Sequence, residues 1–107
     1  MDKYTYRVTW SEEDGEYVGL CAEFPSLSWL DSSDDKAFRG IKNLVAGVIE
    51  DMVSNGEKVP EPLATKKFSG RYPLRMTEQL HRGLSIKAAE QQISLSRFIN
   101  DSLAAAL

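Results

Sequence analysis

The sequence predicts an α+β protein in two parts, with three strands and one long helix before residue 57 and one strand with two short helices after residue 66. Alternating apolar and polar residues indicate the strands, and apolar residues at the helical period indicate the helices. Residues 57–66 follow neither pattern and contain two prolines, which is typical of a stiff, extended linker. We therefore place the domains at 1–56 and 67–107.

The N-terminal part begins with a predicted three-stranded unit. Alternation is clearest from residue 4 to residue 10, which predicts a half-buried first strand with Trp10 in the core. The Glu-Glu-Asp-Gly sequence at 12–15 is typical of a hairpin turn and leads into a second strand at 16–21. A short third strand is expected at 27–30.

One long amphipathic helix follows these strands. Ser32 and Asp35 have the spacing of a capping box with Asp in place of Glu, so the helix is expected to begin there. Asn55 and Gly56 supply a C-terminal stop. The predicted apolar stripe consists of Ala37, Phe38, Ile41, Leu44, Val45, Val48, Ile49, Met52 and Val53. Such a stripe over a small sheet predicts an independent core.

The C-terminal part reads as a strand followed by two helices. The strand has an apolar face and a basic face, formed by Tyr72, Leu74 and Met76 and by Arg71, Pro73 and Arg75. Thr77 is placed to cap a helix that ends near Gln92, and Ser94 a second helix that ends near Ala106. Units below about 40 residues rarely bury enough apolar surface alone, which favours a dimer. This is the layout of a ribbon-helix-helix DNA-binding unit.

Such a dimer presents a two-stranded antiparallel ribbon that can enter the DNA major groove. Arg71 and Arg75 would read bases, because the guanidinium fork matches the acceptors of guanine, and Pro73 shares their face. Ser94, Leu95 and Ser96 would hold a phosphate at the start of the second helix. The alternative interpretation is an edge strand with two solvated arginines in an ordinary α/β domain.

Charge is divided unevenly along the chain. Residues 1–62 contain 6 Lys and Arg against 13 Asp and Glu, whereas residues 63–107 contain 7 against 3. The basic end suits nucleic acid, and the acidic body suits a different partner. Because an acidic body repels the phosphates that the arginines attract, it requires its own explanation.

No catalytic constellation stands out in the sequence. Cys21 is the single cysteine, which excludes an intrachain disulfide and a cysteine-built zinc site, and it is expected to be a small buried hydrophobe. The single histidine, His81, has no second histidine as a metal partner. Only Glu23, Glu50 and Asp51 are candidates for two-metal nuclease chemistry, which needs converging carboxylates. We expect no enzyme, no metal and no cofactor.

The sequence also bears on localisation. No apolar run approaches the roughly 20 residues that span a bilayer. The N-terminus lacks the basic and then apolar pattern of a signal peptide. A cytoplasmic protein is therefore expected.

Several segments together resemble the HicB antitoxins of bacterial toxin–antitoxin pairs, in the subgroup with a C-terminal ribbon-helix-helix. The matching segments cover nearly the whole length and are Tyr4–Trp10, Glu13–Tyr17, Cys21–Pro25, Gly40-Ile41, Leu44-Val45, Val59–Pro62, Phe68–Met76 and Ser94–Ser96. Each segment alone is common, and the combination is specific.

The resemblance implies two roles. The N-terminal part would be similar to a truncated ribonuclease H fold and would cover HicA, a small ribonuclease toxin related to double-stranded-RNA-binding domains. The C-terminal homodimer, or a higher oligomer, would bind the operator of its own operon and repress it. A toxin that grips RNA must carry a basic surface, which the acidic body is suited to mask. Trp29, Glu23 and Asp31 are the expected toxin contacts, although a buried role for Trp29 is an equal alternative.

Three residues depart from the usual family pattern. Thr77 replaces a proline, Gln92 a glycine and Ser96 an asparagine. Gln92 is costly if its position is left-handed. The alternative function is a stand-alone dimeric ribbon-helix-helix repressor whose acidic domain senses a small molecule. A nucleic-acid-processing enzyme would need metal-dependent cleavage through Glu23 or Glu50.

Overall fold

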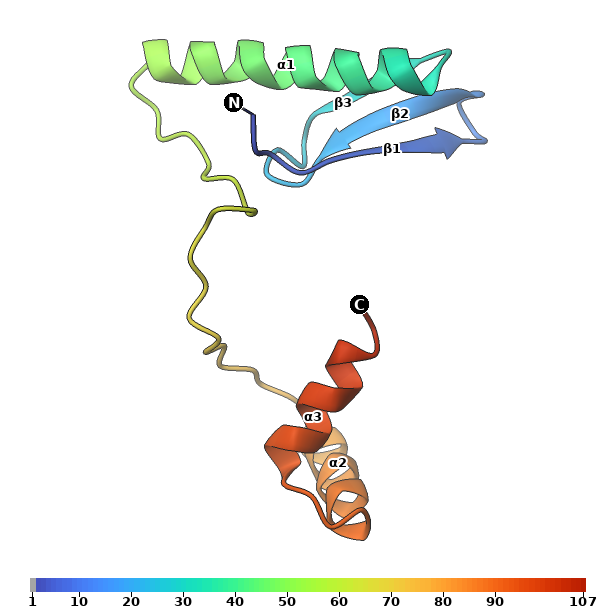
Figure 1. Cartoon of the computed structure of the whole chain (residues 1–107), viewed down its shortest axis with the longest axis vertical. Helices are drawn as coiled ribbons and strands as arrows, with labels where there is room; N and C mark the ends of the chain where they lie inside the picture. Colours follow the sequence, from blue (N-terminus) through green and yellow to red (C-terminus); the bar gives the residue numbers. More distant parts are fainter. Residues whose placement is uncertain (1) are drawn as a thin grey trace. The chain divides into compact units, whose positions relative to one another are not determined.

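The computed structural model describes residues 2–107 and confirms the predicted α+β fold. A three-stranded antiparallel sheet comes first and three helices follow (Figure 1). The chain divides into two compact units, the first ending at Ser69 and the second spanning Gly70–Leu107. Within residues 2–107, no helix combines the length and the apolar character that crossing a membrane requires.

The sheet of the first unit contains β1 (Tyr6–Ser11), β2 (Glu16–Cys21) and β3 (Ser28–Asp31), in the order β1-β2-β3. All three predicted strands are present, with ends within two residues of the expected positions. Gly15 closes the first hairpin with φ 64°, a left-handed conformation that glycine adopts without strain. The hairpin predicted from the Asp-Gly pair is therefore confirmed.

A single long helix, α1 (Asp34–Ser54), covers one face of this sheet (Figure 1). Its cap is Ser33 and not Ser32, because Ser33 has extended backbone angles and its Oγ accepts a hydrogen bond from the amide of Lys36 at 3.2 Å. The amide of Ser32 instead donates to the carboxylate of Asp31 at 2.8 Å. The predicted start of the helix was therefore wrong by one residue.

The predicted stripe of α1 forms most of the core of this unit. Its centre is fully buried, while Phe38 and Val53 are largely exposed. The predicted stop after the stripe is also present, since α1 ends at Ser54 with Asn55 as its C-cap and Gly56 at φ 70°. The buried cluster consists of Cys21, Phe24, Ile41 and Val45, with Tyr4, Tyr6, Leu27, Leu44, Val48, Ile49 and Met52 packed against it.

Two glycines set the distance between the helix and the sheet. A Cβ on Gly19 would lie 2.6 Å from the carbonyl oxygen of Ala37, and one on Gly40 would lie 2.1 Å from the indole of Trp29. Both contacts are too short for any side chain to fit without a shift of the backbone or the indole. Helix α1 can therefore lie directly on β2 and under the Trp29 ring.

Trp10 does not lie in the core as predicted, since 48% of its side chain is exposed. It pairs with Tyr17 near the hairpin end of β1, and its ring packs edge-on against the Tyr17 ring at 5.1 Å. β1 is an edge of the sheet, so no further strand covers Trp10 from outside. Alternation correctly placed Trp10 on the face that α1 covers, but could not show that the covering helix is narrower than the sheet.

The second unit contains α2 (Glu78–Glu90) and α3 (Leu95–Ala104), which pack against each other. The two predicted caps are confirmed, because Thr77 Oγ1 accepts from the amide of Leu80 and Ser94 Oγ from the amide of Arg97, both at 3.1 Å. Both helices end within two residues of their predicted ends.

Residues 71–77 form no strand within one chain. A ribbon strand needs the hydrogen bonds of a partner strand, and no strand described in residues 2–107 pairs with this segment. Ala88 is the one buried apolar residue that the structure describes in the second unit. The two short helices therefore leave most of their apolar surface uncovered.

Candidate functional site

The predicted base-reading residues lie on the exposed segment that precedes α2. Arg71, Pro73 and Arg75 are all exposed, and they alternate with Tyr72 and Leu74, whose side chains are 85% and 60% exposed. A largely exposed tyrosine and leucine in alternation with arginines favour burial of this apolar face against a partner, because an isolated strand would leave the face in water. The segment therefore has one face that requires cover and one that presents positive charge.

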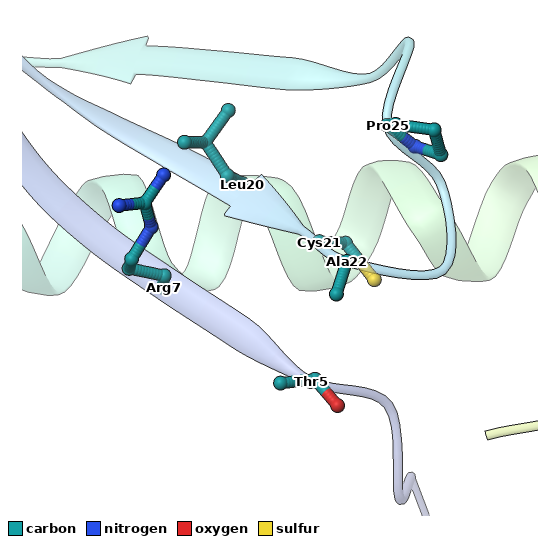
Figure 2. A pocket seen from close by; sticks show the side chains of 6 residues that line it. All are labelled: Thr5, Arg7, Leu20, Cys21, Ala22 and Pro25. Carbon is teal, nitrogen blue, oxygen red and sulfur yellow. The ribbon is translucent and has the colours of Figure 1, made fainter. Parts of the chain in front are cut away.

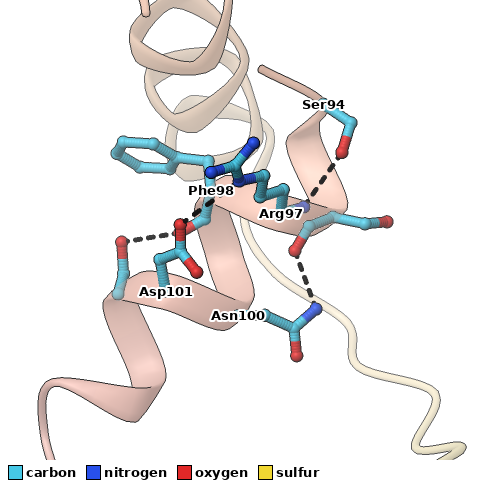
Figure 3. Close-up of polar contacts among 7 residues, drawn as sticks. Ser94, Arg97, Phe98, Asn100 and Asp101 are labelled. Carbon is cyan, nitrogen blue, oxygen red and sulfur yellow. Dashed lines mark hydrogen bonds and ion pairs between the residues drawn. The ribbon is translucent and has the colours of Figure 1, made fainter.

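The predicted phosphate contacts surround the start of α3. Ser94 Oγ accepts from the amide of Arg97 (Figure 3), and the carbonyl of Ser94 accepts from the amide of Phe98 at 3.0 Å. The amides of Leu95 and Ser96 precede these donors, and neither finds an acceptor among residues 2–107. Two amide donors at the positive end of a helix form a suitable contact for one phosphate oxygen pair.

The remaining polar side chains of α3 bind within their own helix. Asn100 Nδ2 donates to the carbonyl of Ser96 at 2.8 Å, and Arg97 Nε lies 3.8 Å from a carboxylate oxygen of Asp101 (Figure 3). Both members of the ion pair are largely exposed, so the pair contributes little to stability. These contacts hold the side chains along the helix and leave its first turn open.

In the first unit, Glu23 fastens the segment after α1 to the start of the sheet. Its carboxylate accepts from the amides of Thr5 at 2.9 Å and Leu63 at 2.8 Å, and from Thr5 Oγ1 at 3.1 Å. Partial burial alone would raise the pKa of Glu23, but the donations from the Leu63 and Thr5 amides outweigh it and lower the pKa to about 2. Part of the predicted linker is thus bound to the first unit.

A second hydrogen bond supports the same attachment. The hydroxyl of Tyr4 donates to the carbonyl of Pro60 at 2.6 Å, and the Tyr4 ring packs edge-on against Phe24 at 5.4 Å. The segment after α1 therefore returns to the residues immediately before β1. It leaves the length of β1 itself uncovered.

The other two predicted toxin contacts lie on β3, at the opposite edge of the sheet. Trp29 is 41% exposed, and its indole nitrogen donates to Asp31 at 3.4 Å. The amide of Ser32 donates to the same carboxylate, and this bond, more than any other cause, lowers the pKa of Asp31. Glu23 lies elsewhere, at the start of the sheet, so the structure does not bring the three residues together in one surface.

Within the first unit, no described helix covers the face of the sheet opposite α1 (Figure 1). Figure 2 shows Arg7 and Leu20 on this face, beside Thr5, Ala22 and Pro25, which line a shallow pocket with Cys21. Val18 and Leu30 lie directly opposite each other in the strand register and belong to the same face. The face is therefore apolar along its centre.

The strand register also gathers acidic residues at one end of the sheet. Ser11 pairs with Glu16 and Tyr17 pairs with Asp31, so the 12–16 turn and the 31–35 turn meet at the same end. The acidic residues of these two turns are Glu12, Glu13, Asp14, Glu16, Asp31, Asp34 and Asp35. We call this set the acidic end.

The candidate catalytic residues do not converge. Glu50, Asp51 and His81 are exposed, and Glu23 is engaged by backbone amides. Across residues 2–107, no group of three His, Cys, Asp or Glu side chains is positioned to hold a metal ion. Cys21 is 2% exposed, as predicted, and its burial raises the pKa of the thiol.

A family comparison bears on the kind of partner. The model of the HicB family matches residues 53–103, from the end of α1 to most of α3. Over this segment the chain is similar to the HicB family. Searches of the curated proteins and of the solved structures found no match. The usual role of HicB proteins is that of an antitoxin and not of an enzyme, and the match is consistent with a toxin as partner.

Sequence reasoning missed two features of the first unit. One is the Glu23 contact with Leu63, which joins residues 40 positions apart and leaves no local pattern. The other is the open edge of β1, since alternation marks a strand without saying which neighbours it has. The number of strands could have indicated the open edge, because a three-stranded sheet that does not close into a barrel always has two edge strands.

Proposed function

We propose that this protein is an antitoxin that neutralises a HicA-type messenger-RNA-cleaving toxin and, as a dimer, binds operator DNA to repress its own operon. The observation that carries the proposal is the incomplete core of the second unit. Thirty-eight residues bury one apolar side chain and expose Tyr72, Leu74, Leu80 and Leu103 by half or more. A second copy is the simplest cover for such a surface.

The dimer contact proposed here is the strand segment before α2. Two copies of residues 71–76 pairing antiparallel would satisfy each other's backbone groups and bury their apolar side chains against the helices. Pro73 is compatible with this pairing only if its nitrogen faces away from the partner strand or sits at a defect of the ladder. This is the ribbon-helix-helix arrangement that the sequence predicts.

In that ribbon the opposite face would meet the DNA. Arg71 and Arg75 would reach base edges in the major groove, with Pro73 between them, while the free amides of Leu95 and Ser96 under the Ser94 cap would hold the backbone. The guanidinium contacts specify the sequence and the amide contacts position the dimer. Each good arginine–guanine pair contributes about 1–3 kcal/mol of discrimination.

The toxin would bind the first unit. Residues 2–69 contain 8 Lys and Arg against 13 Asp and Glu, and the acidic end concentrates seven of these carboxylates. An RNA-binding toxin has a basic surface that such a unit attracts and covers. Trp29 and Asp31 lie at this end and remain proposed contacts, whereas the carboxylate of Glu23 acts through the attachment of the segment that follows α1.

The proposed function assigns one fold and one set of borders to the two domains. The order β1-β2-β3 followed by a helix on one face supports a truncated ribonuclease H-like first domain. The domain borders are proposed at 1–56 and 67–107 with a linker between them, the toxin-binding function on the first and dimerisation and DNA binding on the second.

A separation-of-function experiment tests the proposal. The Arg71→Ala/Arg75→Ala protein should lose operator binding in an electrophoretic shift assay and still rescue cells that express the toxin. The matched control is Arg82→Ala/Lys87→Ala, which removes the same charge from exposed positions of α2. Sequence-specific binding retained by the first variant, or lost equally by the control, refutes the ribbon assignment. Failure of the parent protein to rescue the cells refutes the antitoxin role.

A further inference from the structure

β1 is an edge strand without the usual protection. Natural edge strands are kept short, carry lysine or proline, or are bulged, because unpaired backbone groups invite another strand. β1 has six residues, Tyr-Arg-Val-Thr-Trp-Ser, with one charge, no proline and no glycine. The other edge, β3, has four residues and its tryptophan lies over Gly40. The length and composition of β1 are typical of a strand that has a neighbouring strand on each side.

The hydrogen-bond pattern shows which backbone groups of β1 face outward. The amide of Ala22 donates to the carbonyl of Thr5, so these opposed residues form a hydrogen-bonded pair. Hydrogen-bonded pairs alternate along an antiparallel ladder, which turns the backbone groups of Arg7 and Thr9 toward β2. The N–H and C=O groups of Tyr6, Val8 and Trp10 therefore point away from β2, and no strand described in the structure lies beyond them.

The side chains beside this edge are aromatic and only half covered. Tyr6, Val8 and Trp10 lie on the face that α1 covers, and the ring of Phe38 from α1 packs edge-on against Tyr6 at 6.0 Å. Phe38 remains 42% exposed and Trp10 48% exposed. An added strand would place every second side chain against these rings.

The negative charge of the first unit favours a basic partner at the β1 edge over a second copy of the same unit. A second copy of the first unit would bring together two bodies that each carry 13 acidic residues against 8 basic ones. The acidic end lies at the C-terminal end of β1, where Glu12, Glu13 and Asp14 follow Ser11 in the turn. An extended segment with lysine or arginine beside it complements this charge, and a copy of β1 does not.

We propose that a basic partner protein, which is the toxin if the proposed function holds, docks by adding one of its strands to the open edge of β1. The added strand pairs with the outward groups of Tyr6, Val8 and Trp10 and packs its inner side chains against Trp10 and Phe38. Its basic residues lie against the acidic turn at 12–14. The proposal rests on the proposed antitoxin function and adds the mode of recognition.

Residue-resolved amide hydrogen exchange on the full chain tests the docking mode. The probe is an inactive variant of a HicA-type toxin from the same genome, and complex formation is first followed by gel filtration. On binding, the amides of Tyr6, Val8 and Trp10 should become at least tenfold slower to exchange. The amides of Arg7 and Thr9 already donate to β2 and serve as internal controls, because they should change much less.

A matched pair of variants tests the same edge by affinity. Val8→Pro removes one outward N–H and leaves the bonds to β2 intact, and proline is tolerated on edge strands in that orientation. Val8→Ala trims the same side chain but keeps the N–H. The proline variant should bind the toxin at least tenfold more weakly than the alanine variant. If the proline variant does not fold, the hydrogen-exchange experiment on the parent chain determines whether the toxin pairs with the β1 edge.

The outcomes separate the two claims. A complex whose protection falls on β3 or on the open face of the sheet, with the amides of Tyr6, Val8 and Trp10 unchanged, overturns strand addition and leaves the antitoxin role standing. If these amides are already protected in the free protein, and the protection increases with protein concentration, the edge pairs with a second copy of the chain. That result also overturns the inference. Absence of any complex overturns the proposed function, and the inference with it.

Discussion

Replacing Gln92 with glycine should stabilise the second unit. Gln92 has φ 57°, the one positive φ of a non-glycine residue that the structure describes. It stands directly after the C-cap of α2, where its amide donates to the carbonyl of Ala89 and the amide of Ile93 to that of Ala88, both at 3.1 Å. These two bonds form a Schellman motif, whose left-handed position is normally a glycine.

The magnitude follows from two opposing effects. A left-handed backbone costs a residue with a Cβ about 1–2 kcal/mol. Glycine gives back about 0.5–1 kcal/mol of this through the greater freedom of the unfolded chain. The Gln92 side chain is exposed and makes no hydrogen bond in the described structure, so its loss adds no further cost. We expect a net gain of about 0.5–1 kcal/mol per chain, and twice that for a dimer.

Urea unfolding of the full chain, followed by far-ultraviolet circular dichroism at one fixed protein concentration, measures the effect. Gln91→Gly is the control, because Gln91 is also exposed but has right-handed angles, φ −87° and ψ −3°. Glycine there should destabilise the unit by about 0.5–1 kcal/mol. A Gln92→Gly protein no more stable than the parent, or equal effects of the two glycines, would refute the strain at this turn.

Three further predictions concern the first unit. The pKa of Glu23 is lowered from 4.5 to about 2. The Glu23 carboxylate therefore contributes fully to stability above pH 4.5, and this contribution is lost as the pH falls toward 2. Glu23→Gln should make the stability of the unit less dependent on pH between these values, as measured by acid unfolding. Ser33→Ala should lower the stability of the unit by about 1 kcal/mol in urea unfolding, and Ser32→Ala by clearly less. Gly40→Ala should destabilise the first unit and shift tryptophan fluorescence, because the new Cβ would lie 2.1 Å from the indole of Trp29. The Cβ of Gly47→Ala would meet no atom within 4 Å, so this variant should stabilise α1 by about 1 kcal/mol. The reverse order in either pair would contradict the packing or capping described above.

Local chemistry was enough to predict most elements of this fold. Thr77 and Ser94 cap helices because their short hydroxyl side chains reach back to the amide three residues on, and this depends on the sequence nearby alone. The same reasoning failed at α1, where two adjacent serines could each cap the helix; Ser33 does so, while the amide of Ser32 donates to Asp31. The sequence indicates that a left-handed backbone at Gln92 would cost stability, but only the structure shows that Gln92 adopts it.

Tertiary placement was the part that the sequence could not supply. Trp10 follows the strand period and lies on the predicted face, yet its exposure depends on how far α1 and a neighbouring strand extend, and neither distance is encoded near Trp10. The same holds for the candidate site. Alternation predicts that Arg71 and Arg75 share a face, and this stays a prediction, because the proposed ribbon would be formed by two chains whereas one chain has an exposed segment there.

The two units of the chain are incomplete in different ways, and this difference argues for two different partners. The second unit lacks a core, since it exposes apolar side chains on both of its helices and on the segment before them, so it needs a partner in order to be stable. The first unit has a closed core around Ile41 and Val45, so its packing does not require a second copy, and it leaves the edge of β1 open to a partner. A permanent self-association suits the former, and a reversible contact with a protein of opposite charge suits the latter. The proposed function, a DNA-binding dimer that binds a toxin through its first unit, is consistent with this difference.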